Sequence, residues 1–268
     1  MKKIAYVIGD QTKKSLSPLI FNYWIHRYNI KNFEYRYKQI QLKNFDKEIK
    51  KILLDNSVCG FNVTIPFKEK IIPYLDRLDT HSKKIKAVNF VFKDGNKWIG
   101  KNYDWLGFKK SLTFKNNIKN KNTAVIIGYG GASKAIIYSL LRLGYLKIKI
   151  FNRSFEKTKK LNDSSSNIKT YRLGEVNKHI SSADLIINAI PNNVISPNIA
   201  KNSRKTTIVY DVVYRPKHTK FLSLFEKQNK VYGISMLVHQ AAPCFHSWFG
   251  IMPKVDKELL KKLDEKIA

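Results

Sequence analysis

The sequence lacks several features that would indicate a disulfide-rich, metal-binding or membrane-spanning protein. It contains only two cysteines, Cys59 and Cys244, which cannot build a disulfide framework and show no metal-binding spacing. No run of about 18 apolar residues occurs, so we expect no membrane-spanning helix and no membrane partner. The apolar run near the N-terminus is too short for a signal peptide. These absences favour a cytoplasmic protein whose cysteines lie in its core.

Acidic residues are also scarce. The chain has 50 lysines and arginines against 20 aspartates and glutamates, which gives a formal net charge of +30. Such a charge can indicate nucleic-acid binding. The lysines are spread over the whole chain, however, without a dense basic tail or a nucleic-acid-binding motif. We therefore expect no nucleic-acid partner and interpret the charge as a composition bias, although a diffuse positive field attracts anionic small molecules.

The chain of 268 residues does contain enough apolar residues, 43%, for one large core or two smaller ones. Strand-like and helix-like segments alternate, which predicts an α/β architecture. The pattern restarts near residues 104–106 and returns near 239, which indicates two domains. Ser17 is expected to cap a helix whose first residue is Pro18. We expect strands at 4–9, 33–40, 59–65, 123–128, 147–153, 183–190, 206–214 and 231–233, and a hairpin at 87–102. We expect helices at 17–28, 44–55, 68–77, 236–250 and 256–267, and a glycine turn that leads into a helix within 128–144.

A glycine-rich turn follows the strand at 123–128 and opens the next helix, the context that a dinucleotide-binding fingerprint requires. Gly128 and Gly130 allow a tight turn and a close approach of the backbone to a pyrophosphate. Free N–H groups at the start of the helix then bind the phosphates. A plain strand-to-helix turn is the alternative, but it would not need Gly131 as well.

The end of the second strand of this domain distinguishes between cofactors. NAD sites usually carry an acidic residue there, about 20 residues after the glycines. This sequence has Asn152, Arg153 and Ser154, followed by Lys157, and no acid that would repel a 2′-phosphate. A guanidinium can bind a phosphate through two hydrogen bonds, so NADP is favoured over NAD. The alternative is that Arg153 and Lys157 are ordinary surface charges.

Polar residues recur in the first half of the chain where apolar ones would be the default. Each has an ordinary explanation as a helix cap or a turn residue. Asp104 falls at the expected domain junction, where ligand clefts often lie. The full set is Ser15, Ser17, Asn62, Thr64, Lys68, Asn89, Asn102 and Asp104.

Taken together, these segments resemble the shikimate dehydrogenase family over nearly the whole chain. The resemblance is carried by eight motifs in the family's order: S-x-S-P at 15–18, N-V-T-x-P-x-K at 62–68, A-V-N at 87–89, G-x-N-x-D at 100–104, G-x-G-G-A at 128–132, N-R-S at 152–154, Y-D-x-x-Y-x-P-x-x-T at 210–219 and M-L-V-x-Q-A at 236–241.

The resemblance implies a fold of two domains. The first is an N-terminal α/β substrate domain, 1–104, completed by C-terminal helices at 239–268. The second is a Rossmann-type, doubly wound NADP domain at 105–238. It further implies a monomer or a homodimer that catalyses the reversible, NADP-linked reduction of 3-dehydroshikimate to shikimate. No metal is implied, because the nicotinamide carries the hydride chemistry.

Site residues follow from the matching motif positions. The resemblance assigns Lys68 and Asp104 as the catalytic pair. Its substrate-binding positions are Ser15, Ser17, Thr64, Lys68, Asn89, Asp104, Tyr214 and Gln240. Its NADP-binding positions are Gly128, Tyr129, Gly130, Gly131, Ala132, Asn152, Arg153, Ser154, Lys157, Val212 and Gly233.

The chemistry of the catalytic pair agrees with this assignment. Hydride transfer to a ketone leaves negative charge on the oxygen, which needs a nearby cation and then a proton. A lysine supplies both, since its reference pKa of about 10.4 keeps it protonated at neutral pH. Asp104 can orient Lys68 and a substrate hydroxyl.

The sequence departs from the family pattern at several positions, and the glycine often found after position 190 is also missing. Phe90, Tyr103 and Ile190 stand where threonine is usual, and Tyr129 stands where alanine is common. Because Tyr103 precedes Asp104, these departures bear on substrate preference. A paralogue that oxidises quinate or another hydroxy acid, perhaps with NAD, therefore stays an alternative. A non-catalytic NADP-binding or nucleic-acid-associated protein is a further one, although it would have no need of the catalytic pair.

Overall fold

The computed structural model describes residues 2–113, 118, 120–163, 165–191, 196 and 198–268. Contacts between Cα atoms group the chain into two compact units. The first unit is Met1–Asp104 with Gln240–Leu263, and the second is Trp105–His239 with Asp264–Ala268. The last five residues thus group with the second unit, whereas the sequence placed the whole C-terminal segment in the first.

The first unit is built on a mixed six-stranded sheet with the order β2-β1-β3-β5-β6-β4. Strands β1 and β2 are parallel, as are β1 and β3, while β5 pairs antiparallel with β3 and β6. The strands are β1 (Lys3–Gly9), β2 (Phe33–Gln39), β3 (Val58–Val63), β4 (Arg77–Leu78), β5 (Phe90–Asp94) and β6 (Lys97–Lys101). Between β5 and β6 lies the expected tight turn, where Gly95 has a φ of +59°.

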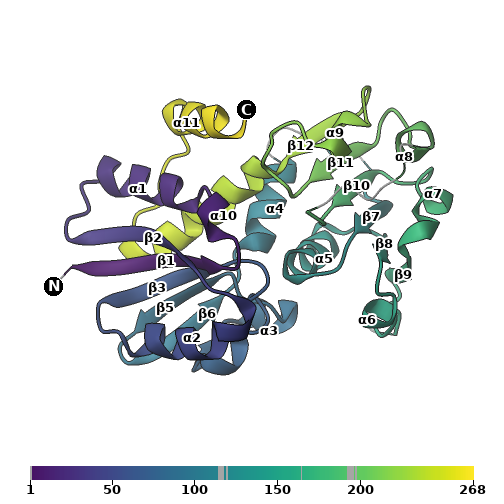
Figure 1. The fold of residues 1–268 in the computed structure, drawn as a ribbon. Coiled ribbons are helices and arrows are strands. Elements are labelled where there is room, and N and C mark those ends of the chain that lie inside the picture. Colours follow the sequence, from purple (N-terminus) through teal and green to yellow (C-terminus); the bar gives the residue numbers. More distant parts are fainter. Residues whose placement is uncertain (1, 114–117, 119, 164, 192–195, 197) are drawn as a thin grey trace. The chain divides into compact units, whose positions relative to one another are not determined.

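Helices cover both faces of this sheet (Figure 1). The aromatic side chains of α1 (Ser17–Arg27) pack on those of α10 (Gly233–Phe249), for example Phe21 on Trp248 and Trp24 on Phe245. On the other face, α2 (Phe45–Leu54) buries Phe45 and Ile49 against the sheet. The short α3 (Thr80–Ile85) and the C-terminal α11 (Lys257–Ile267) complete the helices that contribute to this unit.

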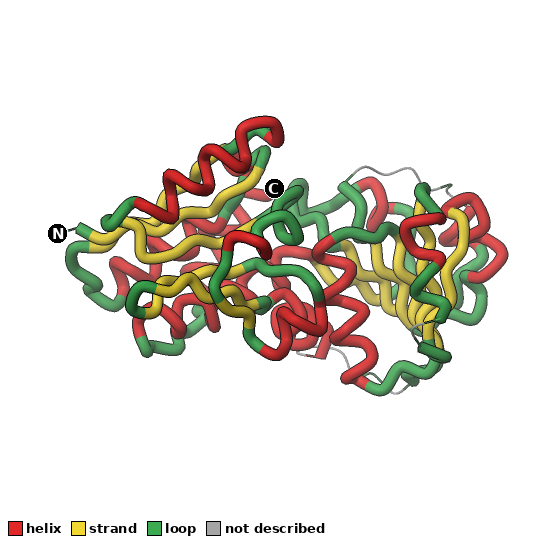
Figure 2. Tube along the Cα trace, turned by 90° about the horizontal axis from the view of Figure 1, so that it is seen from below, coloured by secondary structure: helices red, strands yellow, loops and turns green. Residues whose placement is uncertain are grey.

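The second unit has an all-parallel six-stranded sheet with the order β12-β11-β10-β7-β8-β9, and helices flank it (Figure 2). Its central strand is buried at every residue, as expected where helices cover both faces. The strands are β7 (Thr123–Ile127), β8 (Lys147–Asn152), β9 (Ile168–Arg172), β10 (Leu185–Asn188), β11 (Ile208–Asp211) and β12 (Asn229–Tyr232). The helices that follow the first sheet along the chain and precede α10 are α4 (Asp104–Thr113), α5 (Gly131–Leu143), α6 (Glu156–Lys159), α7 (Val176–His179), α8 (Asn198–Lys201) and α9 (Lys220–Ser223).

Two expectations about local structure were wrong. The segment 68–77 is not a helix; only Ile72–Tyr74 forms a 3-10 turn, because Pro73 has no N–H to donate and disfavours helix before it. Ser17 is not the N-cap of α1 either. The N-cap is Leu16, and Ser17 is the first residue of the helix, with its backbone N–H donating to Ser15 Oγ over 3.2 Å.

Among the described residues, no helix is long and apolar enough to cross a membrane. In the same part of the chain, no three His, Cys, Asp or Glu side chains are placed to hold a metal ion. Cys59 is half-buried and Cys244 is buried, and both are free thiols.

Candidate active site

Lys68 and Asp104 form an ion pair in the first unit. Lys68 lies just beyond β3, after a turn in which the Phe67 N–H donates to the Thr64 carbonyl, and Asp104 is the first residue of α4. Lys68 Nζ lies 2.5 Å from Asp104 Oδ2, and the two side chains are only 12% and 6% exposed. Because little water screens the pair, their attraction is stronger than that of a surface ion pair.

The second carboxylate oxygen of Asp104 is held by Asn89. Asn89 Nδ2 donates to Asp104 Oδ1 over 2.9 Å and to Gln240 Oε1 over 2.9 Å. Asn89 Oδ1 accepts from the backbone N–H of Tyr103 over 2.7 Å. Both N–H bonds of this amide are therefore engaged, and the amide fixes Asp104 and Gln240 relative to each other.

A second layer of buried amides supports these residues. Asn102 Oδ1 accepts from the Asp104 N–H over 3.0 Å. Asn62 Nδ2 donates to the Asn89 carbonyl, and the Tyr35 hydroxyl donates to Asn62 Oδ1 over 2.8 Å. Burial raises the pKa of Tyr35 well above its ordinary value, so its hydroxyl stays protonated as a donor.

The polar sequence pattern included Asn62 and Asn102, but they were not predicted as site residues, and Tyr35 was missed altogether. Asn62 could have been recognised from the sequence, because it places an amide side chain within an otherwise apolar strand. Tyr35 could not be found in this way, because its contact with Asn62 joins β2 to β3 across β1.

Ser15, Ser17 and Thr64 follow the carboxyl ends of neighbouring strands. Strands β1 and β3 are parallel, with Ile8 opposite Val63, so the segments after them leave the same edge of the sheet. Thr64 sits so close to Gly9 that a Cβ there would lie 2.4 Å from Thr64 Cγ2. The remaining substrate-binding position of the sequence analysis, Tyr214, is half-buried in the second unit after β11.

The glycine turn of the second unit has the geometry of a phosphate cradle. Gly128 has a φ of +99°, a conformation that glycine adopts without strain, and a Cβ there would lie 2.4 Å from Ile190 Cγ2. The turn follows β7, beside which the strand order reverses between β7 and β10. Helix α5 begins with Gly130 as its N-cap, without a side-chain capping bond, which suits a pyrophosphate at the helix N-terminus.

The candidate 2′-phosphate site lies at the end of β8. Arg153 and Lys157 are exposed there, and neither makes an ion pair with any residue that the structure describes. Asn152 Nδ2 donates to the Ser154 carbonyl over 2.9 Å, which shapes the turn that carries Arg153. This arrangement leaves two cations available to an anion, and the residues fit NADP.

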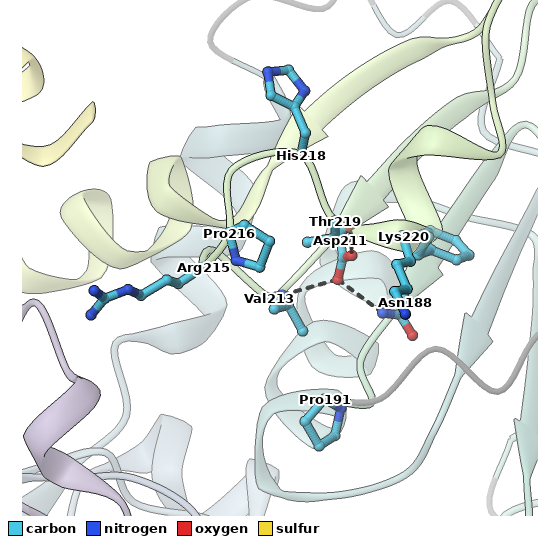
Figure 3. A pocket seen from close by; sticks show the side chains of 10 residues that line it. Asn188, Pro191, Asp211, Val213, Arg215, Pro216, His218, Thr219 and Lys220 are labelled. Atoms are coloured by element: carbon cyan, nitrogen blue, oxygen red, sulfur yellow. Dashed lines mark hydrogen bonds between the residues drawn. The ribbon is translucent and has the colours of Figure 1, made fainter. Parts of the chain in front are cut away.

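A pocket of about 430 Å³ opens at the carboxyl ends of β10 and β11, the edge where open α/β sheets bind their ligands (Figure 3). Asp211 is one of the residues that line the pocket, and its carboxylate accepts from Asn188 Nδ2 over 2.9 Å and from Thr219 Oγ1 over 2.5 Å. Burial raises the pKa of Asp211 above its ordinary value. Its bonds hold in place the loop that carries Val212 and Tyr214.

Gly233, another predicted cofactor position, has a packing role that the structure explains. It is the first residue of α10, and a Cβ there would lie 2.4 Å from the Val212 carbonyl oxygen. The absence of a side chain therefore allows α10 to begin directly against the loop after β11.

Comparison with known proteins identifies the family to which this geometry belongs. A model described as the substrate binding domain of shikimate dehydrogenase matches residues 7–91, and one described as shikimate / quinate 5-dehydrogenase matches residues 112–212. A shikimate dehydrogenase (NADP(+)) from Pelagibacter ubique is 37% identical over 272 residues, covering 98% of this chain and 100% of that protein. The chain belongs to the shikimate dehydrogenase family.

Solved shikimate dehydrogenases share the fold. The enzyme from Aquifex aeolicus is 30% identical, with a TM-score of 0.86, and the match covers 98% of this chain and 97% of that one. A shikimate dehydrogenase solved in complex with NADP+ is 28% identical, with a TM-score of 0.85, over 100% of this chain and 96% of that one. The resemblance and the two-domain α/β fold predicted from the sequence are thereby confirmed.

Within the first unit of this shikimate dehydrogenase family member, the structure brings together four of the predicted site residues, Lys68, Asp104, Asn89 and Gln240. Within the second unit, the glycine turn and the end of β8 both stand at the carboxyl edge of the parallel sheet. The sequence motifs had grouped the same residues without showing which hydrogen bonds connect them.

Proposed function

We propose that Lys68 and Asp104 are the catalytic pair with which this chain, an NADP-dependent shikimate dehydrogenase, reduces 3-dehydroshikimate to shikimate. The observation that carries the proposal is the shielded 2.5 Å ion pair, whose carboxylate is also fixed by Asn89. A lysine and an aspartate in such contact form a proton donor whose position is set before substrate arrives.

In the proposed mechanism, NADPH supplies the hydride. Lys68 faces the ketone oxygen, stabilises the negative charge that develops there and donates the proton. Asp104 holds the ammonium group of Lys68 in place with Oδ2 and contacts a ring hydroxyl of the substrate. In the reverse direction, Lys68 in its neutral amine form accepts the proton of the shikimate hydroxyl.

The remaining substrate contacts are assigned in the same proposal from the matching motif positions. Ser15, Ser17 and Tyr214 hold the carboxylate. Thr64, Asn89 and Gln240 hold the ring hydroxyls. Because both N–H bonds of Asn89 already serve Asp104 and Gln240, its contribution rests on the orientation of these two groups and on its Oδ1.

Cofactor binding is assigned to the second unit. The turn from Gly128 to Ala132 holds the pyrophosphate, and the segment from Asn152 to Lys157 holds the adenosine 2′-phosphate. Val212 and Gly233 are assigned to the same cofactor site. We further propose a cytoplasmic location and either a monomer or a homodimer, as the family resemblance implies.

An activity assay tests this proposal. Purified protein is mixed with 3-dehydroshikimate and NADPH, and the absorbance of the reduced cofactor is followed. Parallel reactions run in reverse, with shikimate or quinate and either NADP or NAD. The proposal expects turnover of 3-dehydroshikimate with NADPH and a clear preference for NADP and shikimate in reverse. Absence of turnover would contradict it, and a preference for quinate would favour the paralogue that oxidises a different hydroxy acid.

A further inference from the structure

Tyr103, which stands where the family usually has threonine, makes two hydrogen bonds that join the catalytic turn to α10. Its backbone N–H donates to Asn89 Oδ1 over 2.7 Å. Its hydroxyl lies 2.7 Å from Ser247 Oγ, and either oxygen can be the donor. Burial raises the pKa of Tyr103, so the hydroxyl remains protonated at neutral pH. The residue immediately before Asp104 is thus bonded to a helix that lies far away in the sequence.

One face of α10 contacts the candidate site at three successive positions. Gln240, Cys244 and Ser247 are spaced by four and three residues, so they line the same face of the helix. Gln240 Oε1 accepts from Asn89, and Cys244 Sγ lies 3.4 Å from Asn62 Nδ2. Ser247 makes the third contact, through Tyr103. The rotation of α10 about its axis affects whether Gln240 reaches Asn89, and the Tyr103–Ser247 bond is a contact two turns away that opposes such a rotation.

The ring of Tyr103 belongs to an aromatic cluster that contains the neighbouring departure from the family pattern. Its centroid lies 5.6 Å from that of Phe90, and Phe90 lies 4.8 Å from Trp248. Trp248 fits against the backbone of Gly60, where a Cβ would lie 2.6 Å from its Nε1. Phe90 and Tyr103 therefore form one packing unit against the C-terminal part of α10, not two unrelated substitutions.

We propose that Tyr103 is a positioning residue, whose hydroxyl bond to Ser247 holds α10 so that Gln240 is presented to the substrate beside Asp104. The proposal rests on the assignment of Gln240 to substrate binding made above. It adds that, in this chain, the position before Asp104 acts on the substrate through α10 and not by contact.

Tyr103→Phe tests the proposal, because it removes the hydroxyl and keeps the ring. We expect KM for 3-dehydroshikimate to rise about three- to tenfold, the effect of one lost neutral hydrogen bond. The value of kcat and the Kd of NADPH should change by less than about twofold, since no catalytic or cofactor-binding group is removed. Ser247→Ala should reproduce this pattern, and the double variant should be no worse than either single variant.

A second cycle separates positioning from a purely structural role. In a Gln240→Ala background, Tyr103→Phe should leave kcat/KM nearly unchanged, because the positioned group is already gone. Tyr23→Phe is the matched control: its hydroxyl bonds Asp256 in the C-terminal segment, so its loss should affect stability only. A lower Tm of Tyr103→Phe with an unchanged KM, or the same loss of kcat/KM in both backgrounds, would overturn the proposal. Either outcome leaves the catalytic assignment of Lys68 intact, since that is measured by kcat in the parent background.

Discussion

At the scale of single residues, Asp104 is held in place at both of its carboxylate oxygens and at its backbone N–H. One of its carboxylate oxygens faces Lys68, the other faces Asn89, and its backbone N–H is bonded to Asn102. A charged donor and an amide on opposite oxygens leave the carboxylate little rotational freedom. Lys68 is held in turn by Asp104, which in the proposed mechanism gives the proton donor a defined position.

The motifs allowed the residues of this pair to be predicted from the sequence, but not the bonds that fix them. Asn89 was expected to bind substrate, and the structure shows that both of its N–H bonds serve other side chains. Whether both N–H bonds of Asn89 have acceptors depends on the position of Gln240, which is 151 residues away in the sequence. The Ser17 cap was wrong for a similar reason, because hydrogen-bonding capacity alone does not show where a helix begins.

Arg153→Ala should weaken the binding of NADPH selectively. Loss of a charge-assisted hydrogen bond to the 2′-phosphate predicts an increase in KM for NADPH of about tenfold or more. KM for NADH, which has no 2′-phosphate, should stay within about twofold, and kcat should change little. Steady-state kinetics with each cofactor measures both values.

Lys159→Ala is the matched control for Arg153, because Lys159 is an exposed cation on the adjacent helix α6. It should leave both KM values unchanged. Arg153 does not bind the 2′-phosphate if the parent enzyme uses NADH and NADPH equally well, or if Arg153→Ala raises both KM values by the same factor.

At the scale of secondary-structure elements, the strands and helices with strong apolar periodicity were predicted, and the weak ones were not. Strand β9 has few apolar residues because it lies at the edge of its sheet, and it was missed. Helix α3 was also missed, since it is short and depends on Asp79, whose side chain accepts from the Ser82 N–H. The error at 68–77 arose because the lysines and isoleucines there suit a helix, whereas Pro73 prevents one.

Gly233→Ala should disturb the start of α10. The new Cβ would approach the Val212 carbonyl oxygen to 2.4 Å, and backbone atoms cannot move aside as a flexible side chain can. We expect the free energy of unfolding to fall by about 1–3 kcal/mol, the usual cost of overpacking. Urea denaturation followed by circular dichroism measures this change.

Gly174→Ala provides the control, because a Cβ at Gly174 meets no atom within 4 Å. Its free energy of unfolding should match that of the parent protein within about 0.5 kcal/mol, as for most surface substitutions. Equal stability of the Gly233 variant and the parent would show that the loop after β11 moves aside, and that the tight approach is not required.

At the scale of the whole molecule, the charge of +30 is the property that fold and site leave unexplained. With 50 basic and 20 acidic residues, many cations have no acidic partner to pair with. Unbalanced charge of one sign destabilises a compact state through self-repulsion, and salt screens that repulsion.

We therefore expect Tm to rise by about 2–5 °C as NaCl increases from about 10 mM to about 200 mM, because the Debye length shrinks from about 30 Å to less than 10 Å. Thermal unfolding followed by circular dichroism gives this value. The same screening should raise KM for the anionic cofactor. A Tm that falls or stays constant over this range would indicate that the positive charges are already compensated or too dispersed to repel.

The most direct test of the catalytic assignment is the kcat of Lys68→Ala with saturating 3-dehydroshikimate and NADPH. Loss of the proton donor predicts a decrease of about 10²-fold or more, with the Kd of NADPH unchanged in a fluorescence titration. Lys70→Ala, which removes an exposed lysine two residues further along the chain, should retain the parent kcat. A Lys68→Ala variant with a normal kcat would contradict the central claim that Lys68 protonates the substrate.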